Sequence, residues 1–500
     1  MNEILTLSLA EQIEGLGRRA FSARDLLEAT WTRCEASRDL GAYLTMNELE
    51  RLRVQAASAD ERRARGDVRP LEGLPIAVKD NICVKSMRMT AGSRILSSYH
   101  PPYDAHVVER LKEAGALILG KTNLDEFGFG SSTENSAYFP CRNPWNVERV
   151  PGGSSGGSAT AVAASMASAA LGSDTGGSIR QPAAMTGVVG LKPTWGRVSR
   201  YGLVAFASSL DQIGPMTREV RDAAILLQAI GGHDPRDSTS DKGELPDLLS
   251  EIDAGCRGFR IGIPREWDQD GLAPSVRRAL NEAAAVFEKA GARLVQLSLP
   301  HARYGIAMYY IIAAAEASSN LARYDGVRYG ERADADHLEA LYYRSRTAGF
   351  GPEVRRRVLL GTYVLSAGYY DAYYGQALRA RRHLQADFDA AFSRCDVLLM
   401  PTTPSAAFPL GARRDPLSMY LEDVFTVGAS LAGLPAISFP AGKDEDGLPI
   451  GCQLVGPRFA EDRLLRVARC FERETAWHTR RPPLQTPRKE DDRGGAAMDA

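Results

Sequence analysis

The sequence has no excess of charge of either sign. Of its 500 residues, 61 are Lys or Arg and 62 are Asp or Glu, so the formal net charge is −1. A chain that grips nucleic acid by itself usually carries a basic excess that displaces counterions from phosphate. The balanced composition therefore argues against extensive nucleic-acid binding by this chain alone, although it leaves room for a local basic patch.

Long hydrophobic runs are also missing. The longest candidate, residues 159–171, is too short to cross a bilayer and contains Ser and Thr. Residues 1–29 lack a basic segment followed by an apolar one, so they predict an amphipathic helix and no signal peptide. We therefore expect no membrane contact.

Cysteine pairs and histidine pairs at metal-ligand spacing are absent as well. The 7 cysteines are scattered, odd in number and never arranged as CxxC. This usage is typical of reduced thiols, so we expect a cytoplasmic protein. The 7 histidines show neither HxxxH nor HExxH spacing, and the sequence therefore predicts no metal site.

Short apolar runs alternate with helical patterns from residue 71 onward. With 44% hydrophobic and 25% charged residues, the composition is that of an ordinary globular protein. Strands are predicted at 74–78, 116–119, 188–191, 260–263, 397–400, 436–439 and 451–455. Helices are predicted at 106–114, 155–170, 218–229 and 274–290. This alternation indicates an α/β fold with a largely buried sheet.

Three stretches of the chain differ in texture. Residues 1–65 are charged and predict a helical segment packed on the core. Residues 66–480 form the main domain, in which the Tyr- and Arg-rich stretch of about 300–395 predicts a helical insertion over the sheet. The tail, 481–500, is rich in Pro and charge, and we expect it to be loosely ordered.

Two formal motif matches fail on their structural context. Residues 115–122 fit the P-loop pattern GxxxxGK[ST], but the four intervening residues are apolar and predict a strand whose amides serve a sheet. Residues 152–156 fit the nucleophile-elbow pattern GxSxG, which should directly follow a strand. The preceding segment, 143–151, contains two prolines and predicts a loop. We assign function to neither match.

Two Ser/Gly-rich turns lie on either side of an Ala-rich segment between residues 151 and 180. The first turn ends at a predicted helix N-terminus, where free N–H groups favour an anion. If the chain folds back, Ser154 and Ser178 come close together. Gly176 and Gly177 would then let backbone amides approach a reacting carbonyl group. The alternative is a Ser/Gly linker around a core helix, although a flexible linker would not enclose a buried helix.

Lys79 follows directly on the apolar run 74–78. A lysine at the end of a buried strand usually reaches for water. The alternative is a desolvated lysine that serves as a base, because burial lowers the lysine pKa from its usual value of about 10.4. A pKa near 8 would cost about 3–4 kcal/mol of free energy.

The strings that contain these residues are similar to the amidase signature family. They are LPIAVKDN at 74–81, VPGGSSGGS at 150–158 and GSDTGGSIR at 172–180. Further strings more narrowly resemble the glutaminase subunits of tRNA-dependent amidotransferases, within a resemblance that spans roughly residues 5–480. These further strings lie at 125–136, 181–183, 187–194, 196–215, 316–330 and 361–374.

The resemblance implies a single amidase domain, built on a large mixed sheet with helices on both sides. It also implies a Ser–cis-Ser–Lys triad, in which Ser178 is the nucleophile, Ser154 the bridging serine and Lys79 the base. The peptide bond between Gly153 and Ser154 would be cis, a rare arrangement for a non-proline residue. The oxyanion hole would be formed by the amides of Thr175, Gly176 and Gly177.

The resemblance further implies a pocket for glutamine, whose carboxylate and ammonium both need partners. An arginine within 354–358 would bind the carboxylate, and we take Arg356, with the register among Arg355, Arg356 and Arg357 left open. The other implied contacts are Asp423, Tyr309 or Tyr310, and the carbonyl groups near Gly128 and Phe129. Phe129 is larger than the Met usual in the family, so we expect it to reshape this pocket.

The resemblance implies a heterotrimer with B and C subunits and no cofactor in this chain. The ammonia released from glutamine would pass to a partner that binds ATP and Mg²⁺. That partner would also hold the mischarged Glu-tRNA(Gln) or Asp-tRNA(Asn). A stand-alone hydrolase of another small amide and a catalytically dead scaffold remain as alternatives.

Overall fold

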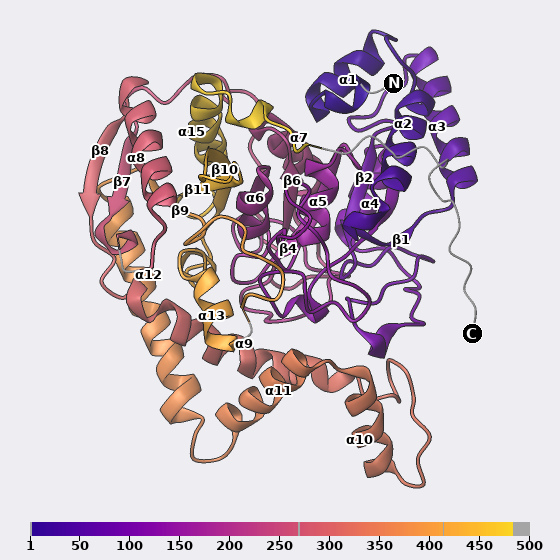
Figure 1. Ribbon diagram of the computed structural model, residues 1–500, viewed down its shortest axis with the longest axis vertical. Coiled ribbons are helices and arrows are strands. Elements are labelled where there is room, and N and C mark those ends of the chain that lie inside the picture. The colour runs from indigo at the N-terminus through magenta and orange to yellow at the C-terminus, as the bar shows by residue number, and fades with distance from the viewer. Residues whose placement is uncertain (1–2, 269–270, 414, 484–500) are drawn as a thin grey trace.

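An 11-stranded mixed sheet runs through the molecule in the order β1-β3-β2-β4-β6-β5-β10-β11-β9-β7-β8. The computed structural model describes residues 3–268, 271–413 and 415–483, and helices pack along the sheet (Figure 1). Most of the tail predicted to be loosely ordered, residues 484–500, lies outside the described residues. The large mixed sheet of the predicted α/β fold is confirmed.

The strands are β1 Tyr43–Met46, β2 Pro75–Lys79, β3 Leu117–Thr122, β4 Ala169–Asp174, β5 Val189–Lys192, β6 Gln212–Thr217, β7 Arg260–Pro264, β8 Arg293–Leu297, β9 Val397–Pro401, β10 Ala436–Lys443 and β11 Pro449–Val455. The helices are α1 Leu9–Gly17, α2 Ala23–Ala36, α3 Leu49–Ala64, α4 His106–Glu113, α5 Gly156–Ala163, α6 Arg180–Thr186, α7 Val220–Ile230, α8 Pro274–Lys289, α9 Gly305–Asn320, α10 Leu338–Gly349, α11 Pro352–Leu365, α12 Gln376–Phe392, α13 Pro416–Tyr420, α14 Val427–Leu431 and α15 Glu461–Glu474.

Every strand predicted from the sequence is present, but four others were missed. They are β1, β4, β6 and β8. Strands β4 (AALGSD) and β6 (QIGPMT) are fully buried, yet they hold few of the β-branched and aromatic residues that usually mark a strand. Strand β1 also shows that the N-terminal segment is not purely helical, because it pairs with β3 at the edge of the sheet.

The Ala-rich segment is shorter as a helix than predicted. Helix α5 ends at Ala163, Ser165 has a left-handed backbone with φ 57°, and β4 begins at Ala169. Alanine favours helix locally, but here the small side chains fit a strand buried between β2 and β6. The prediction of one helix over 155–170 was therefore wrong at its C-terminal end.

Strand β4 positions the second Ser/Gly turn. It runs parallel to β2, with Val78 opposite Leu171, so the carboxyl ends of the two strands meet at the same edge of the sheet. Lys79 ends β2 and Asp174 ends β4. The base candidate and the turn that carries Ser178 are therefore brought together by sheet pairing.

Residues 300–395, predicted to be a helical insertion, contain helices α9 to α12, and α10 and α11 extend below the sheet in Figure 1. In the part of the chain that the structure describes, no helix is both long enough and apolar enough to cross a bilayer.

The formal P-loop match forms strand β3, as predicted, and not a phosphate-binding loop. Its lysine, Lys121, is fully buried and lies 2.9 Å from the Asp80 carboxylate, which is buried too. Asp80 also accepts hydrogen bonds from the backbone N–H and the hydroxyl of Thr90. The ammonium group of Lys121 therefore neutralises an internal acid.

Replacing Lys121 by Met is expected to lower the free energy of unfolding by about 3–5 kcal/mol, because it leaves the Asp80 carboxylate buried without a counter-charge. Lys112→Met is the control, since Lys112 pairs with Asp104 near the surface and its loss should cost less than about 1 kcal/mol. Urea unfolding followed by circular dichroism measures both. Equal losses for the two variants would contradict the assignment.

Candidate active site

The amino group of Lys79 lies at the centre of a cage of oxygen atoms. The side chain is fully buried. Its Nζ lies 2.8 Å from Ser154 Oγ, 2.8 Å from Ser155 Oγ and 2.9 Å from Ser173 Oγ. All of these partners are neutral, so hydrogen bonds hold the amino group but no contacting carboxylate stabilises its charge.

This environment favours the neutral amine. Burial lowers the pKa of Lys79 to about 7, although the negative charges of Asp125, Asp174 and Asp211 act in the opposite direction. The structure thus supports a desolvated lysine rather than one that reaches water. A neutral amine at this position can accept a proton from a neighbouring hydroxyl group.

Ser154 sits in the first Ser/Gly turn, and its predicted cis peptide bond with Gly153 is present. The Gly153 N–H donates to Gln181 Oε1 at 2.8 Å, and the Ser155 N–H donates to the carbonyl oxygen of Ser178 at 3.1 Å. These bonds join the two Ser/Gly turns. No strand leads directly into the first Ser/Gly turn, as predicted. The turn is therefore not a nucleophile elbow of the usual strand–turn–helix kind.

Ser178 lies in the second turn, between β4 and α6, and retains 9% exposure. In the described residues, its hydroxyl group makes no hydrogen bond with another side chain, so the contact with Ser154 that a relay needs is not formed here. The backbone N–H groups of Gly176 and Gly177 likewise have no acceptor in that part of the chain. A hydroxyl without a side-chain partner, beside free backbone amides, suits attack on a carbonyl group.

The glycines of this turn are required by close neighbours. A Cβ atom on Gly176 would lie 2.5 Å from the ring of Tyr309. Gly177 has φ +151°, and a Cβ there would lie 2.3 Å from Thr426 Oγ1. The hydroxyl of Thr175 donates a hydrogen bond of 2.6 Å to Asp211, which anchors the start of this turn.

Arg180 joins the second turn to the rest of the scaffold through hydrogen bonds. Its guanidinium group makes two hydrogen bonds of 3.0 Å to Asp174, and both side chains are fully buried. The same group donates to Gln453 Oε1 and to Ser430 Oγ. Burial alone would raise the pKa of Asp174, but the charge and hydrogen bonds of Arg180 lower it below the usual value. Asp174 is therefore a structural anion here.

Asp423, predicted to bind substrate, is buried beside the second Ser/Gly turn, since Thr426 Oγ1 contacts the carbonyl oxygens of both Asp423 and Gly176. Ser131 Oγ lies 2.9 Å from both of its carboxylate oxygens, and the Tyr310 hydroxyl donates to it at 3.3 Å. Burial raises the pKa of Asp423 to about 7, against the hydrogen bond from Ser131 and the charge of Arg357. A cation that entered the site would stabilise its charged form.

The arginine that lies beside Tyr310 and Phe129 is Arg357. The sequence prediction took Arg356 and left the choice among the three arginines open. Arg357 is 3% exposed, and its guanidinium carbon lies 4.9 Å from the ring centre of Tyr310 and 5.4 Å from that of Phe129. The Arg356 side chain is half exposed and pairs with Glu353. Three successive arginines on one helix point in different directions, and the sequence alone left this register open.

The remaining predicted contacts also lie near the two Ser/Gly turns. A Cβ on Gly128 would lie 3.5 Å from Ser154 Oγ, which places the Gly128 backbone against the first turn. Phe129 is buried edge-on against Phe206, with ring centres 4.2 Å apart. Tyr309 is 3% exposed and lies against Gly176.

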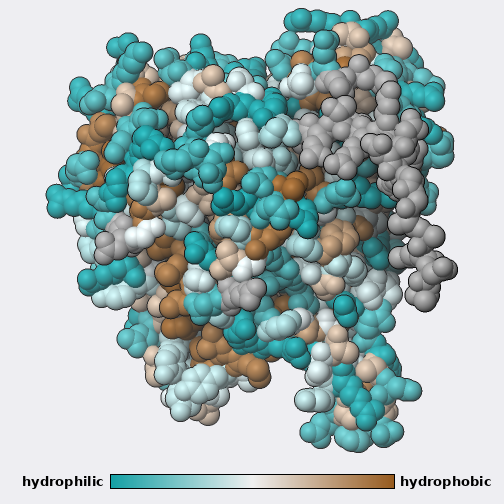
Figure 2. Space-filling view, in the orientation of Figure 1, coloured by the Kyte–Doolittle hydropathy of each residue, from teal (hydrophilic) through white to brown (hydrophobic). Residues whose placement is uncertain are grey.

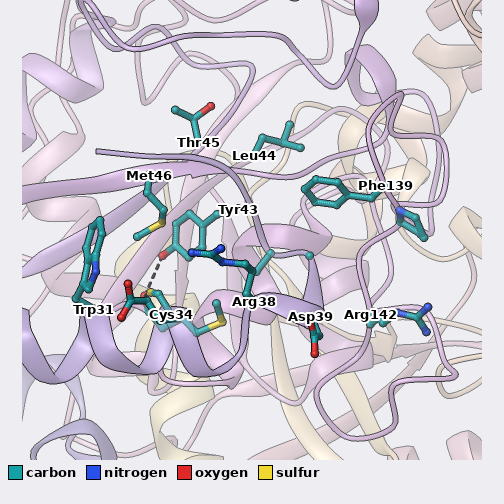
Figure 3. Close-up of a pocket in the computed structure, with 15 residues that line it drawn as sticks. Trp31, Cys34, Arg38, Asp39, Tyr43, Leu44, Thr45, Met46, Phe139 and Arg142 are labelled. Carbon is teal, nitrogen blue, oxygen red and sulfur yellow. Dashed lines mark hydrogen bonds between the residues drawn. The ribbon is translucent and has the colours of Figure 1, made fainter. Parts of the chain in front are cut away.

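Two cavities bear on where a ligand can enter. One of about 340 Å³ lies beside the predicted pocket and is lined by Arg356, Arg357, Glu353 and Tyr420, among others. A larger one of about 490 Å³ lies between α2, β1 and the 139–142 loop (Figure 3). No predicted site residue lines the larger cavity, so volume alone would have misplaced the site.

Sequence reasoning missed several residues that hold the site together. These are Ser155, Ser173, Arg180, Ser131 and Gln181. Four of them lie within or next to the strings that pointed to the triad, so those strings carried the signal. Among the described residues, no group of three or more His, Cys, Asp or Glu side chains is arranged to hold a metal ion.

The family model for amidases matches residues 25–465. The chain belongs to the amidase family. The A subunit of the glutamyl-tRNA(Gln) amidotransferase from Carboxydothermus hydrogenoformans is 56% identical to it over 486 residues, covering 96% of this chain and 100% of that protein. The predicted family resemblance is thus confirmed.

Solved structures of the amidase family share the whole fold. The A subunit of the glutamyl-tRNA(Gln) amidotransferase from Thermotoga maritima gives a TM-score of 0.80 at 42% identity, covering 97% of this chain and 99% of that one. The peptide amidase of Stenotrophomonas maltophilia gives 0.81 at 32% identity, covering 96% and 99%. The fold therefore does not separate the two kinds of amidase, whereas sequence identity favours the first.

The lowered lysine pKa predicts the pH dependence of amide hydrolysis. A base must be deprotonated to act, so kcat/KM should rise as pH increases through about 7 and then level off. Lys79→Arg should be inactive at every pH between about 6 and 9, because a guanidinium group keeps its proton. Steady-state kinetics over this range measure both. A normal profile in Lys79→Arg would remove Lys79 as the base.

Proposed function

We propose that this chain is the glutaminase subunit of a tRNA-dependent amidotransferase. The observation that carries the proposal is the buried Lys79 amine within 2.8 Å of Ser154, beside the turn that presents Ser178. The full-length similarity to A subunits of glutamyl-tRNA(Gln) amidotransferases supports the choice of substrate.

In the proposed reaction, the neutral amine of Lys79 takes a proton from Ser154, which takes one from Ser178. Ser178 Oγ attacks the side-chain amide carbon of glutamine, and the free amides at Gly176 and Gly177 stabilise the oxyanion. Ammonia leaves after it receives the proton through the same relay. Water then hydrolyses the glutamyl ester, which releases glutamate and restores Ser178.

The zwitterionic part of glutamine would be held by two buried groups of opposite charge. Asp423 would bind the ammonium, because the positive charge of the ammonium would favour the ionised carboxylate against the burial that raises its pKa, and Ser131 Oγ already lies at hydrogen-bond distance from both carboxylate oxygens. Arg357 would bind the carboxylate, because its Nε is taken by Glu353 while its Nη atoms have no hydrogen-bond acceptor among the described residues. We assign this role to Arg357 in place of Arg356.

Ammonia made here would be used by partner subunits. We propose B and C subunits as partners, one of which binds ATP, Mg²⁺ and the mischarged tRNA. Exposed apolar and aromatic side chains support a partner surface on the insertion, and Figure 2 shows apolar atoms gathered low on the viewed face. The exposed side chains on the insertion include Leu359, Tyr363, Tyr369, Tyr370 and Tyr373. Interfaces are enriched in Tyr relative to the remaining surface.

A stand-alone amidase acting on another small amide is the second candidate. The observation that favours it is structural similarity to the peptide amidase of Stenotrophomonas maltophilia. That protein matches this chain with a TM-score of 0.81, almost the same as the 0.80 of the Thermotoga maritima protein. The two candidates share the triad and differ in what fills the pocket beside Arg357 and Asp423.

Purified protein, alone and with its partner subunits, is expected to release ammonia from glutamine and little from simple aliphatic amides or peptide amides. Ser178→Ala should abolish this activity while the fold and partner binding remain, and Ser250→Ala, on the exposed surface, is the control. Ammonia release and co-purification measure the outcomes. Strong hydrolysis of simple amides with none of glutamine would favour the second candidate.

The register of the arginines gives a separate prediction. Arg357→Lys is expected to raise the KM for glutamine at least tenfold, or about 1.4 kcal/mol, because a lysine cannot reproduce the planar fork that binds a carboxylate. Arg356→Lys is the matched control on the same helix and should change KM less than about threefold. A larger increase of KM in Arg356→Lys than in Arg357→Lys would instead identify Arg356 as the carboxylate ligand.

A further inference from the structure

Glu126 is a buried acid that the proposed reaction does not use. It is 3% exposed and, within the described residues, has no basic group within salt-bridge distance. Burial raises its pKa to about 7, against hydrogen bonds from Ser93 and Gly351 and the charge of Arg355. A carboxyl group kept in the interior at such a cost needs an explanation in what it contacts.

The carboxyl group of Glu126 joins two segments that are far apart in sequence. Its Oε2 accepts a hydrogen bond of 2.9 Å from the Gly351 N–H, and its Oε1 accepts one of 2.5 Å from Ser93 Oγ. Ser93 Oγ also lies 3.1 Å from the Gly349 carbonyl oxygen. Glu126 and Ser93 together therefore hold the short connection between α10 and α11.

Gly351 directly precedes the first residue of α11. It is the N-cap residue of this helix, followed by Pro352, and no side chain of the helix itself caps it. A Cβ at Gly351 would lie 2.3 Å from Glu126 Oε2, so the contact requires a glycine. An acidic oxygen at a helix N-terminus is also favoured by the helix dipole.

The segment that contains Glu126 touches the same helix again at Arg357. The ring of Phe127 packs on that of Phe350 at 5.7 Å, next to the helix start. Two residues further on, the Phe129 ring lies 5.4 Å from the Arg357 guanidinium carbon. Glu126 thus fixes the start of α11 relative to the segment that lines the site, and Arg357 lies less than two turns along that helix.

We propose that Glu126 is a positioning residue: it clamps the start of α11 so that Arg357 is held at the distance from Ser178 that glutamine spans. This inference rests on the proposed function, because it assigns Arg357 to the substrate carboxylate. It predicts that loss of the clamp weakens substrate binding and leaves the chemistry of the triad in place.

The test is steady-state glutamine hydrolysis by the full chain with its partner subunits. Glu126→Ala is expected to raise KM about tenfold and to change kcat less than threefold, the pattern of lost binding. Glu126→Gln should stay within threefold of the wild type, since its amide can accept from Gly351 and donate to Ser93. Gly351→Ala, which pushes the carboxyl group away without backbone strain, should reproduce the effect of Glu126→Ala.

A double-mutant cycle shows whether Glu126 acts through Arg357. In an Arg357→Lys background, Glu126→Ala should raise KM less than twofold further. An unchanged KM in Glu126→Ala, an equal loss in kcat, or full additivity with Arg357→Lys would overturn the inference. If Glu126→Ala does not fold, Gly351→Ala decides. A wild-type complex that hydrolyses another amide but not glutamine would contradict the proposed function. The role of Glu126 would then be tested by comparing the KM of the wild type and of Glu126→Ala for that amide.

Discussion

Burial of the Lys79 amino group is the constraint on which the site depends. An ammonium group with no contacting carboxylate is costly in the interior, so burial lowers the pKa of Lys79 to about 7 and makes the neutral amine available near neutral pH. Its three serine partners come from two segments, the first Ser/Gly turn and the end of β4. Keeping them within hydrogen-bond distance requires the parallel pairing of β2 with β4.

The nearby acids are arranged so that none of them restores the charge of Lys79 by direct contact. Asp174 is occupied by Arg180, and Asp80 by Lys121. Asp125 accepts from the backbone N–H groups of Thr133 and its neighbours. Each carboxylate thus serves a different part of the scaffold, and the amine at the centre keeps only neutral partners.

Lys79, Ser154 and Ser178 could be singled out from the sequence because each stands in a string that resembles the amidase family, and the structure brings Lys79 to Ser154 as that resemblance implies. Strand β4 could not be predicted, since it begins with Ala and Leu residues that favour helix and only the pairing with neighbouring strands makes it extended. The arginine register stayed open, because Arg355, Arg356 and Arg357 are adjacent on α11 and only packing decides which one faces inward. Contacts across long sequence distances, such as that of Glu126 with Gly351, leave no local pattern at all.

The Arg180 network has a consequence for how the protein is made. All three residues of the proposed triad lie within the first 178 residues, yet Arg180, which braces the second turn, finds partners at Ser430 and Gln453. Gln453 in turn donates to the carbonyl groups of Pro401 and Phe425. During translation, these contacts of Arg180 cannot form until β11 has left the ribosome. A nascent chain thus contains Lys79, Ser154 and Ser178 long before the second turn has all of the contacts that brace it.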